Sequence, residues 1–453
     1  MPAWAGRRVT VVGAGRSGTA AADLLNLLGA IVVVTDQRRP GQLGDFSRLE
    51  SAGIRFELGG HPESLWQETE LVVGSPGIAP SAPPLAAARA QNVPVISEIE
   101  LAAQCTNVPA LAITGSNGKS TVTAMTGAIL NASGRNTEVC GNIGVSWAGL
   151  VADAIRGVAD PDLYVLELSS FQTETIRDFH PRWCALLNLS ADHLDRHGDF
   201  NSYAEAKLRI AANCNAEDWL IYGADDQFIR ENLPAAPRAV PFAHADPSES
   251  PSAFVRDQNI IWRDASGDEH RVLAVADLPV LGSHNALNAC AATALACLAG
   301  ATPGAARQAL AEFRGLPHRS ELCATLDGVL CINDSKATNV GATVAALRGL
   351  DAPIWLILGG RDKDSDFRQL LPHLGNVRGV LLVGEATDAI AEALGDAVPV
   401  QRCETLETAV AAGLAGSQPA DALLLAPACT SFDQYSSFEA RGEHFRTLIN
   451  DRL

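Results

Sequence analysis

The feature that most constrains this chain is a recurring succession of an apolar strand, a glycine-containing turn and an alanine-rich helix. It begins with a predicted buried strand over 9–12, a helix over 20–28 and a second strand over 31–35. A wholly apolar strand is buried on both faces, and strands that alternate with helices form a parallel sheet. The start of the chain therefore predicts a doubly wound α/β domain.

The pattern restarts twice. A strand over 110–114 precedes a helix that begins at Lys119, and a third series of strands follows Gly315–Pro317. Residues 243–270 are polar and favour hairpins and loops. Three α/β domains are expected, Rossmann-like at both ends and with a parallel sheet of the P-loop ATPase type in the centre. The predicted boundaries are 1–107, 108–314 and 315–453.

Composition excludes several classes of protein. The chain has 34 basic and 52 acidic residues, and a net charge of −18 argues against general binding to nucleic acid. No apolar run reaches the roughly 18 residues of a membrane-spanning helix. The ten cysteines show no metal-binding spacing and favour reduced thiols in the core. A strand pattern begins at once, without a targeting segment, so we expect a cytoplasmic protein.

The first glycine turn has the spacing Gly13-x-Gly15-x-x-Gly18, and Asp36 ends the next strand. This arrangement is typical of a dinucleotide site, in which the helix N-terminus at Ser17–Thr19 would bind phosphate. It leaves open whose phosphate is bound, and an NAD-dependent oxidoreductase is one hypothesis. Glycines that only permit tight packing of strand against helix are another.

The second glycine turn, residues 113–121, reads ITGSNGKST and is a shortened P-loop, because the full motif has glycine where this chain has Ile113. Its backbone N–H groups would surround phosphates, Lys119 would reach the β and γ oxygens, and Ser120 would hold Mg²⁺. The predicted nucleotide-binding residues are Gly115, Ser116, Asn117, Gly118, Lys119, Ser120 and Thr121.

Polar clusters follow later strands. Glu167 ends an apolar strand and is a candidate Mg²⁺ ligand or water holder, since strand ends line the ligand crevice of such sheets. Residues 188–197 contain two aspartates, two histidines and an arginine, which suits a metal or phosphate site as well as a polar surface loop. Lys336 and the cations of 359–363 offer contacts to an anionic ligand.

These segments together resemble the Mur ligases, and among them the branch that adds D-glutamate. The similarity keeps its order along nearly the whole chain, and the shortened P-loop is the form that this family uses. It is carried by 114–121, 141–144, 167–172, 192–196, 282–285, 316–319, 333–339, 359–363 and 427–434.

The resemblance implies a substrate site in the first domain that binds UDP rather than NAD. Its expected residues are Arg16, Ser17, Gly18, Thr19, Asp36, Gln37, Arg38 and Ser75, with Asn142 and Ser169 nearer the muramoyl-alanine. Further ATP contacts are implied for Asn285, Asn288, Arg319, Asp334 and Lys336. D-Glutamate would meet Thr338, Lys363, Ser431 and Phe438.

The resemblance also implies two Mg²⁺ sites. Ser120 and Glu167 would serve one ion, and His193 with Lys207, carbamylated in the family, the other. Lys119, Asn142, His193 and Lys207 are the expected catalytic residues.

The implied reaction joins UDP-N-acetylmuramoyl-L-alanine to D-glutamate through an acyl phosphate formed from ATP, by a monomer. A sibling ligase or folylpolyglutamate synthase is the nearest alternative. The segments 427–434 and 438–442 favour the D-glutamate branch, and the Asp-Asn-Pro-Arg motif of the diaminopimelate-adding sibling does not occur. An oxidoreductase or a nucleotide-sensing module would be a protein of another class.

Overall fold

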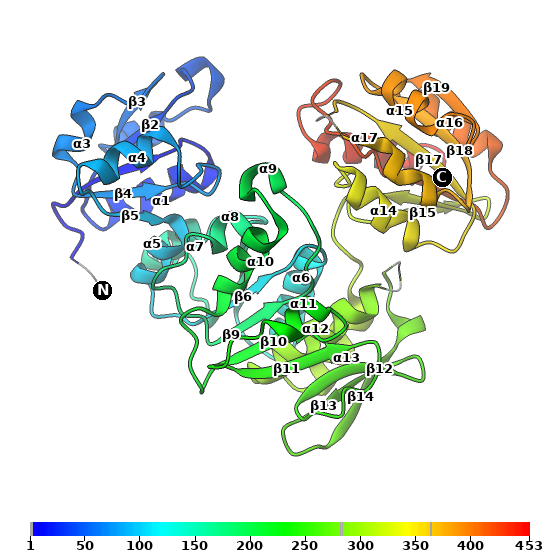
Figure 1. The fold of residues 1–453 in the computed structure, drawn as a ribbon, viewed down its shortest axis with the longest axis horizontal. Coiled ribbons are helices and arrows are strands. Elements are labelled where there is room, and N and C mark those ends of the chain that lie inside the picture. Colours follow the sequence, from blue (N-terminus) through cyan, green and yellow to red (C-terminus); the bar gives the residue numbers. More distant parts are fainter. Residues whose placement is uncertain (1–2, 281, 283, 363–364) are drawn as a thin grey trace. The chain divides into compact units, whose positions relative to one another are not determined.

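The computed structural model describes residues 3–280, 282, 284–362 and 365–453, without the side chain of Asp195, and its strands form three sheets (Figure 1). The predicted three-domain α/β fold is confirmed. The chain divides into two compact units, Met1–Val275 with Leu287–Leu310 and Ala276–Ala286 with Ala311–Leu453. The first unit holds two of the sheets and the second unit holds the third. The three domain boundaries stay predictions.

The first sheet is parallel, with the strand order β3-β2-β1-β4-β5. The order reverses beside β1, and such a switch point opens a ligand crevice at the carboxyl ends of the strands. Its strands are β1 (Arg8–Val12), β2 (Ile31–Asp36), β3 (Arg55–Leu58), β4 (Leu71–Gly74) and β5 (Val95–Ser97). The helices are α1 (Arg16–Leu27), α2 (Ser47–Ser51), α3 (Ser64–Glu68), α4 (Pro83–Ala90) and α5 (Glu98–Cys105).

The central sheet has the order β14-β13-β12-β11-β10-β9-β6-β8-β7. It is parallel up to β12, and β13 and β14 add antiparallel hairpins where the polar segment predicted them. The strands are β6 (Ala110–Thr114), β7 (Thr137–Gly141), β8 (Leu163–Glu167), β9 (Trp183–Leu186), β10 (Trp219–Gly223), β11 (Arg238–Ala243), β12 (Ser252–Arg256), β13 (Asn259–Arg263) and β14 (Glu269–Ala274). The helices are α6 (Lys119–Ala132), α7 (Trp147–Ile155), α8 (Ser170–Thr173), α9 (Leu194–His197), α10 (Phe200–Leu208), α11 (Gln227–Glu231), α12 (His284–Leu298) and α13 (Pro303–Glu312).

The third sheet has the order β15-β16-β20-β17-β18-β19, parallel except for the β15–β16 hairpin. Its strands are β15 (Glu321–Leu326), β16 (Val329–Asn333), β17 (Ile354–Gly359), β18 (Val377–Val383), β19 (Val400–Glu404) and β20 (Ala422–Leu425). The helices are α14 (Val340–Arg348), α15 (Thr387–Leu394), α16 (Leu406–Gly416) and α17 (Phe438–Asn450).

One continuous apolar core joins the first two sheets. It runs from Trp4 and the β1 strand through α5 to Trp147 of α7 and on to Tyr164 of β8. Asp23 of α1 adds an ion pair with Arg156 at 2.9 Å. Shared burial of apolar surface is the dominant attractive force between packed elements, so these two sheets form one unit.

Two expectations from the sequence concern membrane-spanning helices and the cysteines, and both can be compared with the described residues. Within that part of the chain, no helix is long and apolar enough to cross a membrane. All ten cysteines are free thiols, and all but Cys297 and Cys323 are buried, as core thiols should be.

Candidate active site

The P-loop lies between β6 and α6, as predicted. Gly118 caps the helix with a φ of 81°, a left-handed conformation that favours glycine. A Cβ at Gly118 would lie 2.4 Å from Oδ1 of Asn288, so that asparagine lies directly against the loop. The N-terminus of a 14-residue helix and the loop amides together provide an anion site.

Two lysines meet at one carbonyl oxygen of this loop. Lys119 Nζ donates to the carbonyl oxygens of Gly115 and Ser116, both at 2.9 Å, and so folds back over its own loop. Lys207 Nζ, arriving from α10, donates to the same Gly115 oxygen at 2.8 Å. The predicted ATP lysine and the predicted carbamylated lysine are therefore direct neighbours.

Lys207 is almost completely buried, with 1% of its surface exposed. Burial, and after it the Lys119 cation, lowers the pKa of Lys207 to about 6, against the opposing attraction of Asp192 and Glu167. Above that pH the amine is mainly neutral, and a neutral amine is a nucleophile.

Glu167 lies at the end of β8, also buried. Its Oε1 accepts a 2.7 Å hydrogen bond from Asn142 Nδ2, whereas its buried Oε2 has no hydrogen-bond partner among the described residues. A buried carboxylate oxygen without a donor is costly unless a cation or ligand completes it. Ser120, buried in the first turn of α6 directly after the P-loop, supplies a hydroxyl.

His193 and Ser169 lie on the segments that follow β9 and β8. His193 precedes α9 with a φ of 51°, half of its side chain is exposed, and its ring packs on Phe171 with 4.8 Å between centroids. Ser169 caps α8, and its hydroxyl donates to Gln172 at 3.1 Å. Glu167 thus ends the strand beside the one that leads into the P-loop, and its charge acts on Lys207, whereas the contacts of His193 are with Asp192 and Phe171. No group of three or more His, Cys, Asp or Glu side chains fit for a metal occurs within the described residues.

Two side chains that support the loop were not among the predicted site residues. Tyr203 of α10 places its hydroxyl 2.9 Å from Ser116 Oγ, and Asn188 Oδ1 accepts from Asn117 N at 2.8 Å. Asn188 begins the polar segment 188–197, a candidate metal or phosphate site in the sequence, and it follows β9 at the same sheet edge as the P-loop, although it was not predicted individually. Tyr203 lies on a helix, and its sequence neighbourhood carries no such signal.

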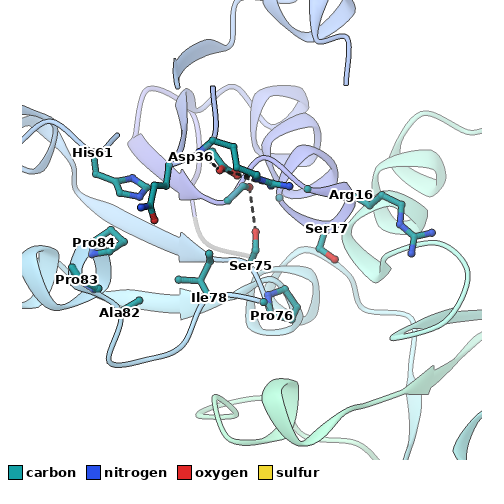
Figure 2. Close-up of a pocket in the computed structure, with 16 residues that line it drawn as sticks. Arg16, Ser17, Asp36, His61, Ser75, Pro76, Ile78, Ala82, Pro83 and Pro84 are labelled. Atoms are coloured by element: carbon teal, nitrogen blue, oxygen red, sulfur yellow. Dashed lines mark hydrogen bonds and ion pairs between the residues drawn. The ribbon is translucent and has the colours of Figure 1, made fainter. Parts of the chain in front are cut away.

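The crevice of the first sheet forms a cavity of about 560 Å³ (Figure 2). Its lining includes predicted substrate residues, namely Arg16, Ser17, Gly18, Asp36, Gln37, Arg38 and Ser75. Thr19 is not part of this lining, and its hydroxyl donates to the carbonyl oxygens of Gly15 and Arg16. Gly18 is required sterically, because a Cβ there would lie 1.8 Å from Gly13 O.

Asp36 organises one wall of the cavity. It accepts from Ala14 N at 2.8 Å and binds Arg38 through two side-chain hydrogen bonds of 3.0 and 2.7 Å. These donors, Arg38 first, hold the pKa of Asp36 well below its usual range and raise the pKa of Arg38.

In the second unit, three loops follow the carboxyl ends of β16, β17 and β20, and Arg441 of α17 connects them. Its guanidinium donates to Ser335 Oγ at 3.0 Å and to carbonyl oxygens in all three loops, namely those of Ser335, Gly359, Cys429 and Thr430. Arg441 is buried, and burial lowers its pKa to about 10. A lone arginine in a helix carries no sequence signal for this role.

Predicted glutamate and nucleotide residues lie on these loops. Lys336 Nζ lies 4.0 Å from the centre of the Phe438 ring, and Ser431 is buried in the loop after β20. Thr338 N donates to Lys336 O at 2.7 Å. Lys363 lies outside the described residues.

Asp334 lies in the loop after β16. Burial raises its pKa to about 6, against the attraction of Arg319 and a 3.3 Å hydrogen bond from Ser320 Oγ. Asn285, at the start of α12, belongs to this second unit and is buried. Its backbone N–H donates to the carbonyl oxygen of Gly282 at 3.0 Å.

Models of known protein families match three successive parts of the chain. Residues 7–97 match the Mur ligase MurD-like N-terminal domain, residues 113–296 the Mur ligase middle domain, and residues 318–429 the Mur ligase glutamate ligase domain. These matches coincide in order with the three sheets.

Curated relatives extend over almost the whole length. A UDP-N-acetylmuramoylalanine–D-glutamate ligase of Acidobacterium capsulatum is 41% identical over 447 residues, covering 98% of this chain and 96% of that protein. The ligase of the same name from Myxococcus xanthus is 40% identical over 458 residues, covering 99% of each.

Solved structures agree in fold. UDP-N-acetylmuramate–alanine ligase MurC of Thermotoga maritima superposes with a TM-score of 0.61 at 18% identity, covering 98% of this chain and 100% of that chain. MurF ligase of the same organism, in complex with ADP, gives 0.60 at 15% identity and covers 100% of both. With three matching domain models and full-length relatives near 40% identity, the chain belongs to the Mur ligase family.

Proposed function

We propose that the protein joins D-glutamate to the carboxylate of UDP-N-acetylmuramoyl-L-alanine with consumption of ATP, in cytoplasmic synthesis of peptidoglycan precursors, as a monomer. The observation that carries this is the meeting of Lys119 and Lys207 at one P-loop oxygen, with the half-satisfied Glu167 at the end of the adjoining strand β8. The full-length relatives named for this reaction specify the amino acid.

In the first step, the terminal carboxylate of the substrate attacks the γ-phosphorus of ATP. A carboxylate oxygen–phosphorus bond forms, the bond from that phosphorus to the β–γ bridging oxygen breaks, and ADP leaves. Such a transfer is catalysed mainly by positioning and neutralisation of charge. The loop amides would hold the phosphates, and Lys119 would exchange its two carbonyl acceptors for phosphate oxygens.

The residues at the P-loop fit Mg²⁺. The unpaired Oε2 of Glu167 and the Ser120 hydroxyl are oxygen donors of the kind that this ion prefers. We assign them to one ion, and His193 with carbamylated Lys207 to a second. When bound, Mg²⁺ supplies positive charge beside the phosphate oxygens. Asn142 would position the Glu167 carboxylate, since it already donates to the other oxygen.

Carbamylation of Lys207 follows from its environment. Its neutral amine would attack the carbon of CO₂, form an N–C bond and release a proton, leaving a carbamate anion. That reaction replaces a neutral amine by an anion next to the Lys119 cation, which the neighbouring charge favours, and burial keeps the amine neutral so that it can react. Lys207 would then be an oxygen ligand.

In the second step, the amine of D-glutamate attacks the acyl carbon and phosphate leaves. The C–N bond forms, the C–O bond to phosphate breaks, and the amine loses a proton. His193, half-exposed on the segment whose Ser190 donates to Ser116 of the P-loop, would supply a donor to the tetrahedral intermediate. We assign the carboxylates of D-glutamate to Thr338, Lys363 and Ser431, with Phe438 beside them.

Phosphate release with the UDP substrate, ATP and Mg²⁺ tests this function. It should require D-glutamate and should not occur with L-glutamate alone or with a UDP sugar that lacks the alanyl carboxylate. Lys119→Ala should reduce the rate at least about a thousandfold, because phosphoryl transfer depends on this charge. Consumption of NAD(P)H instead, or phosphate release indifferent to D-glutamate, would refute the proposal.

A further inference from the structure

The cavity of the first sheet contains a histidine that the function proposed above does not use. His61 follows β3 and lines this cavity. Figure 2 shows His61 beside Pro83 and Pro84 at one end, with Arg16 and Ser17 at the opposite end. The N-terminus of α1 and the Arg16 cation attract phosphate. The end with His61 is therefore left for the nucleoside.

The hydrogen bonds around His61 determine which ring nitrogen carries the proton. Thr35 Oγ1 lies 3.0 Å from the carbonyl oxygen of Gly60 and 3.0 Å from Nδ1 of His61. A carbonyl oxygen can only accept, so the single hydroxyl proton of Thr35 is used on Gly60. His61 must then donate through Nδ1–H, and Nε2 of the neutral ring keeps its lone pair.

That lone pair is available to a ligand. Within the described part of the chain, the hydrogen bond of His61 is the one to Thr35, and the side chain is only partly buried. Desolvation lowers the pKa of His61, although the charge of Asp36 opposes this, so the neutral ring is the favoured form at neutral pH.

The neighbouring carboxylate of Asp36 does not compete with His61 as a hydrogen-bond acceptor for the ligand. Asp36 already receives four hydrogen bonds, from Ala14 N and from the backbone, Nε and Nη2 of Arg38. These occupy the acceptor positions of a carboxylate. His61 Nε2 is therefore an acceptor that this end of the cavity offers without rearrangement.

We propose that His61 is a specificity residue that recognises the uridine part of the substrate, with Nε2 accepting a hydrogen bond from uracil N3–H or from a ribose hydroxyl. The proposal rests on the assignment of this cavity to UDP. Cytosine carries an acceptor at N3 and would face the lone pair of Nε2, and deoxyribose lacks a donor.

Calorimetric titration of the full chain with UDP, CDP, and 2′- and 3′-deoxy-UDP tests the proposal. The unmodified protein should bind UDP about tenfold more tightly than at least one analogue, as expected for one hydrogen bond. His61→Phe should bring that ratio close to one, with affinity for inorganic pyrophosphate unchanged. His61→Gln, which places an amide oxygen near the position of Nε2, should retain most of the ratio.

The affinity ratio that changes in the variants identifies the donor. A change in the ratio of UDP to CDP identifies the base, and a change in the ratio of UDP to a deoxy-UDP identifies the ribose. His244→Phe, a change at an exposed histidine of the central sheet region, is the matched control and should alter no ratio. His61→Leu repeats the test if the phenylalanine variant does not fold. Unchanged ratios in these His61 variants, or equal binding of all four ligands by the unmodified protein, would overturn the role of His61 alone. Failure of the unmodified protein to bind UDP would overturn the assignment of the cavity and His61 together.

Discussion

At the scale of the residue, the lysines of this protein are restricted to the proposed site. The chain contains only four, Lys119, Lys207, Lys336 and Lys363, and all four are predicted site residues. Arginine carries the remaining basic charge and stays protonated when buried, whereas a lysine amine can lose its proton. Lysine-directed measurements on this protein therefore report on the site alone.

The first prediction concerns Lys207. Its folded-state pKa of about 6 lies below the ordinary 10.5, so between these values an unfolded chain holds the proton that the folded one lacks. As pH falls from about 10 to 6 this group costs increasing stability, and above pH 6 the neutral amine can take up CO₂. In protein labelled with ¹³C-lysine, ¹³C-bicarbonate should shift one of four side-chain signals.

That signal should be missing from Lys207→Arg, and activity of the unmodified protein should drop as pH falls through about 6. Lys207→Ala should lose roughly a hundredfold in rate and regain part of it with acetate or formate, which supply a carboxylate. Full activity of Lys207→Arg in buffer free of CO₂ would contradict carbamylation.

The second prediction concerns Arg441. Arg441→Lys replaces a guanidinium with five hydrogen bonds by a point charge that cannot span three loops. We expect the KM for D-glutamate to rise at least about tenfold while the KM for the UDP substrate stays within about twofold. Steady-state kinetics with each substrate varied in turn measures both. The exposed Arg402→Lys is the control, and equal effects of the two substitutions would argue against the role of Arg441.

At the scale of the element, α5 attaches the first sheet to the central one through two buried carboxylates. Glu98 accepts from Ala148 N at 2.7 Å, and Glu100 accepts from the backbone N–H groups of 177–179 at 2.8 to 3.1 Å. Carboxylates suit these positions because they satisfy amides that would otherwise be buried without acceptors.

The third prediction concerns Glu98. Desolvation raises its pKa from 4.5 to about 7, against the hydrogen bond from Ala148, and its charged form would also oppose that of Cys140. The folded state thus holds this proton more tightly than the unfolded state, so stability is complete below pH 4.5 and is lost as pH rises to about 7. The loss amounts to about 3 kcal/mol.

Glu98→Gln is neutral at every pH and keeps an acceptor for Ala148. Denaturant unfolding should therefore find this variant more stable than the unmodified protein at pH 8 and no more stable at pH 4.5. Glu100→Gln should instead be destabilised at both pH values, because the amide NH₂ that replaces one carboxylate oxygen cannot accept from Asp178 N and the negative charge facing three N–H donors is lost. A parallel pH dependence of the unmodified protein and Glu98→Gln would show that Glu98 does not titrate in this way.

At the scale of the whole molecule, the proposed reactants are divided between the two units. In the proposed mechanism the acyl phosphate would form at the P-loop of the first unit, whereas D-glutamate is assigned to the second. Bond formation requires the amine to come within about 3 Å of the acyl carbon. The chain passes between the units at 275–276, 286–287 and 310–311, and these junctions are candidate hinges.

The fourth prediction is that the UDP substrate together with a non-hydrolysable ATP analogue decreases the radius of gyration. The nucleotide is assigned to residues of both units, the P-loop in the first and Arg319 and Asp334 in the second, and the UDP substrate would hold the carboxylate against it, so both ligands should be needed for the full change. Small-angle X-ray scattering measures it, with Gly118→Ala as the control that weakens nucleotide binding. A radius of gyration that is indifferent to both ligands would contradict closure.

The sequence by itself determined the elements and the chemistry of the loops. Continuous apolar runs predicted β1, β2 and β6 to within a residue, because burial selects residue types locally. The glycine spacing of the first turn predicted a phosphate site from the sequence. A Cβ at Gly18 would collide with the carbonyl oxygen of Gly13, so glycine is required there. The role of Lys207 came only with the family resemblance.

The tertiary structure decided which side chains meet. Lys207 lies 92 residues from Gly115 in sequence, yet it shares that carbonyl oxygen with Lys119. The tautomer of His61, the unpaired oxygen of Glu167 and the three loops joined by Arg441 likewise depend on contacts between distant segments. Burial and the interaction between charges depend on which groups are close in the folded structure, and the spacing of residues along the chain does not determine this.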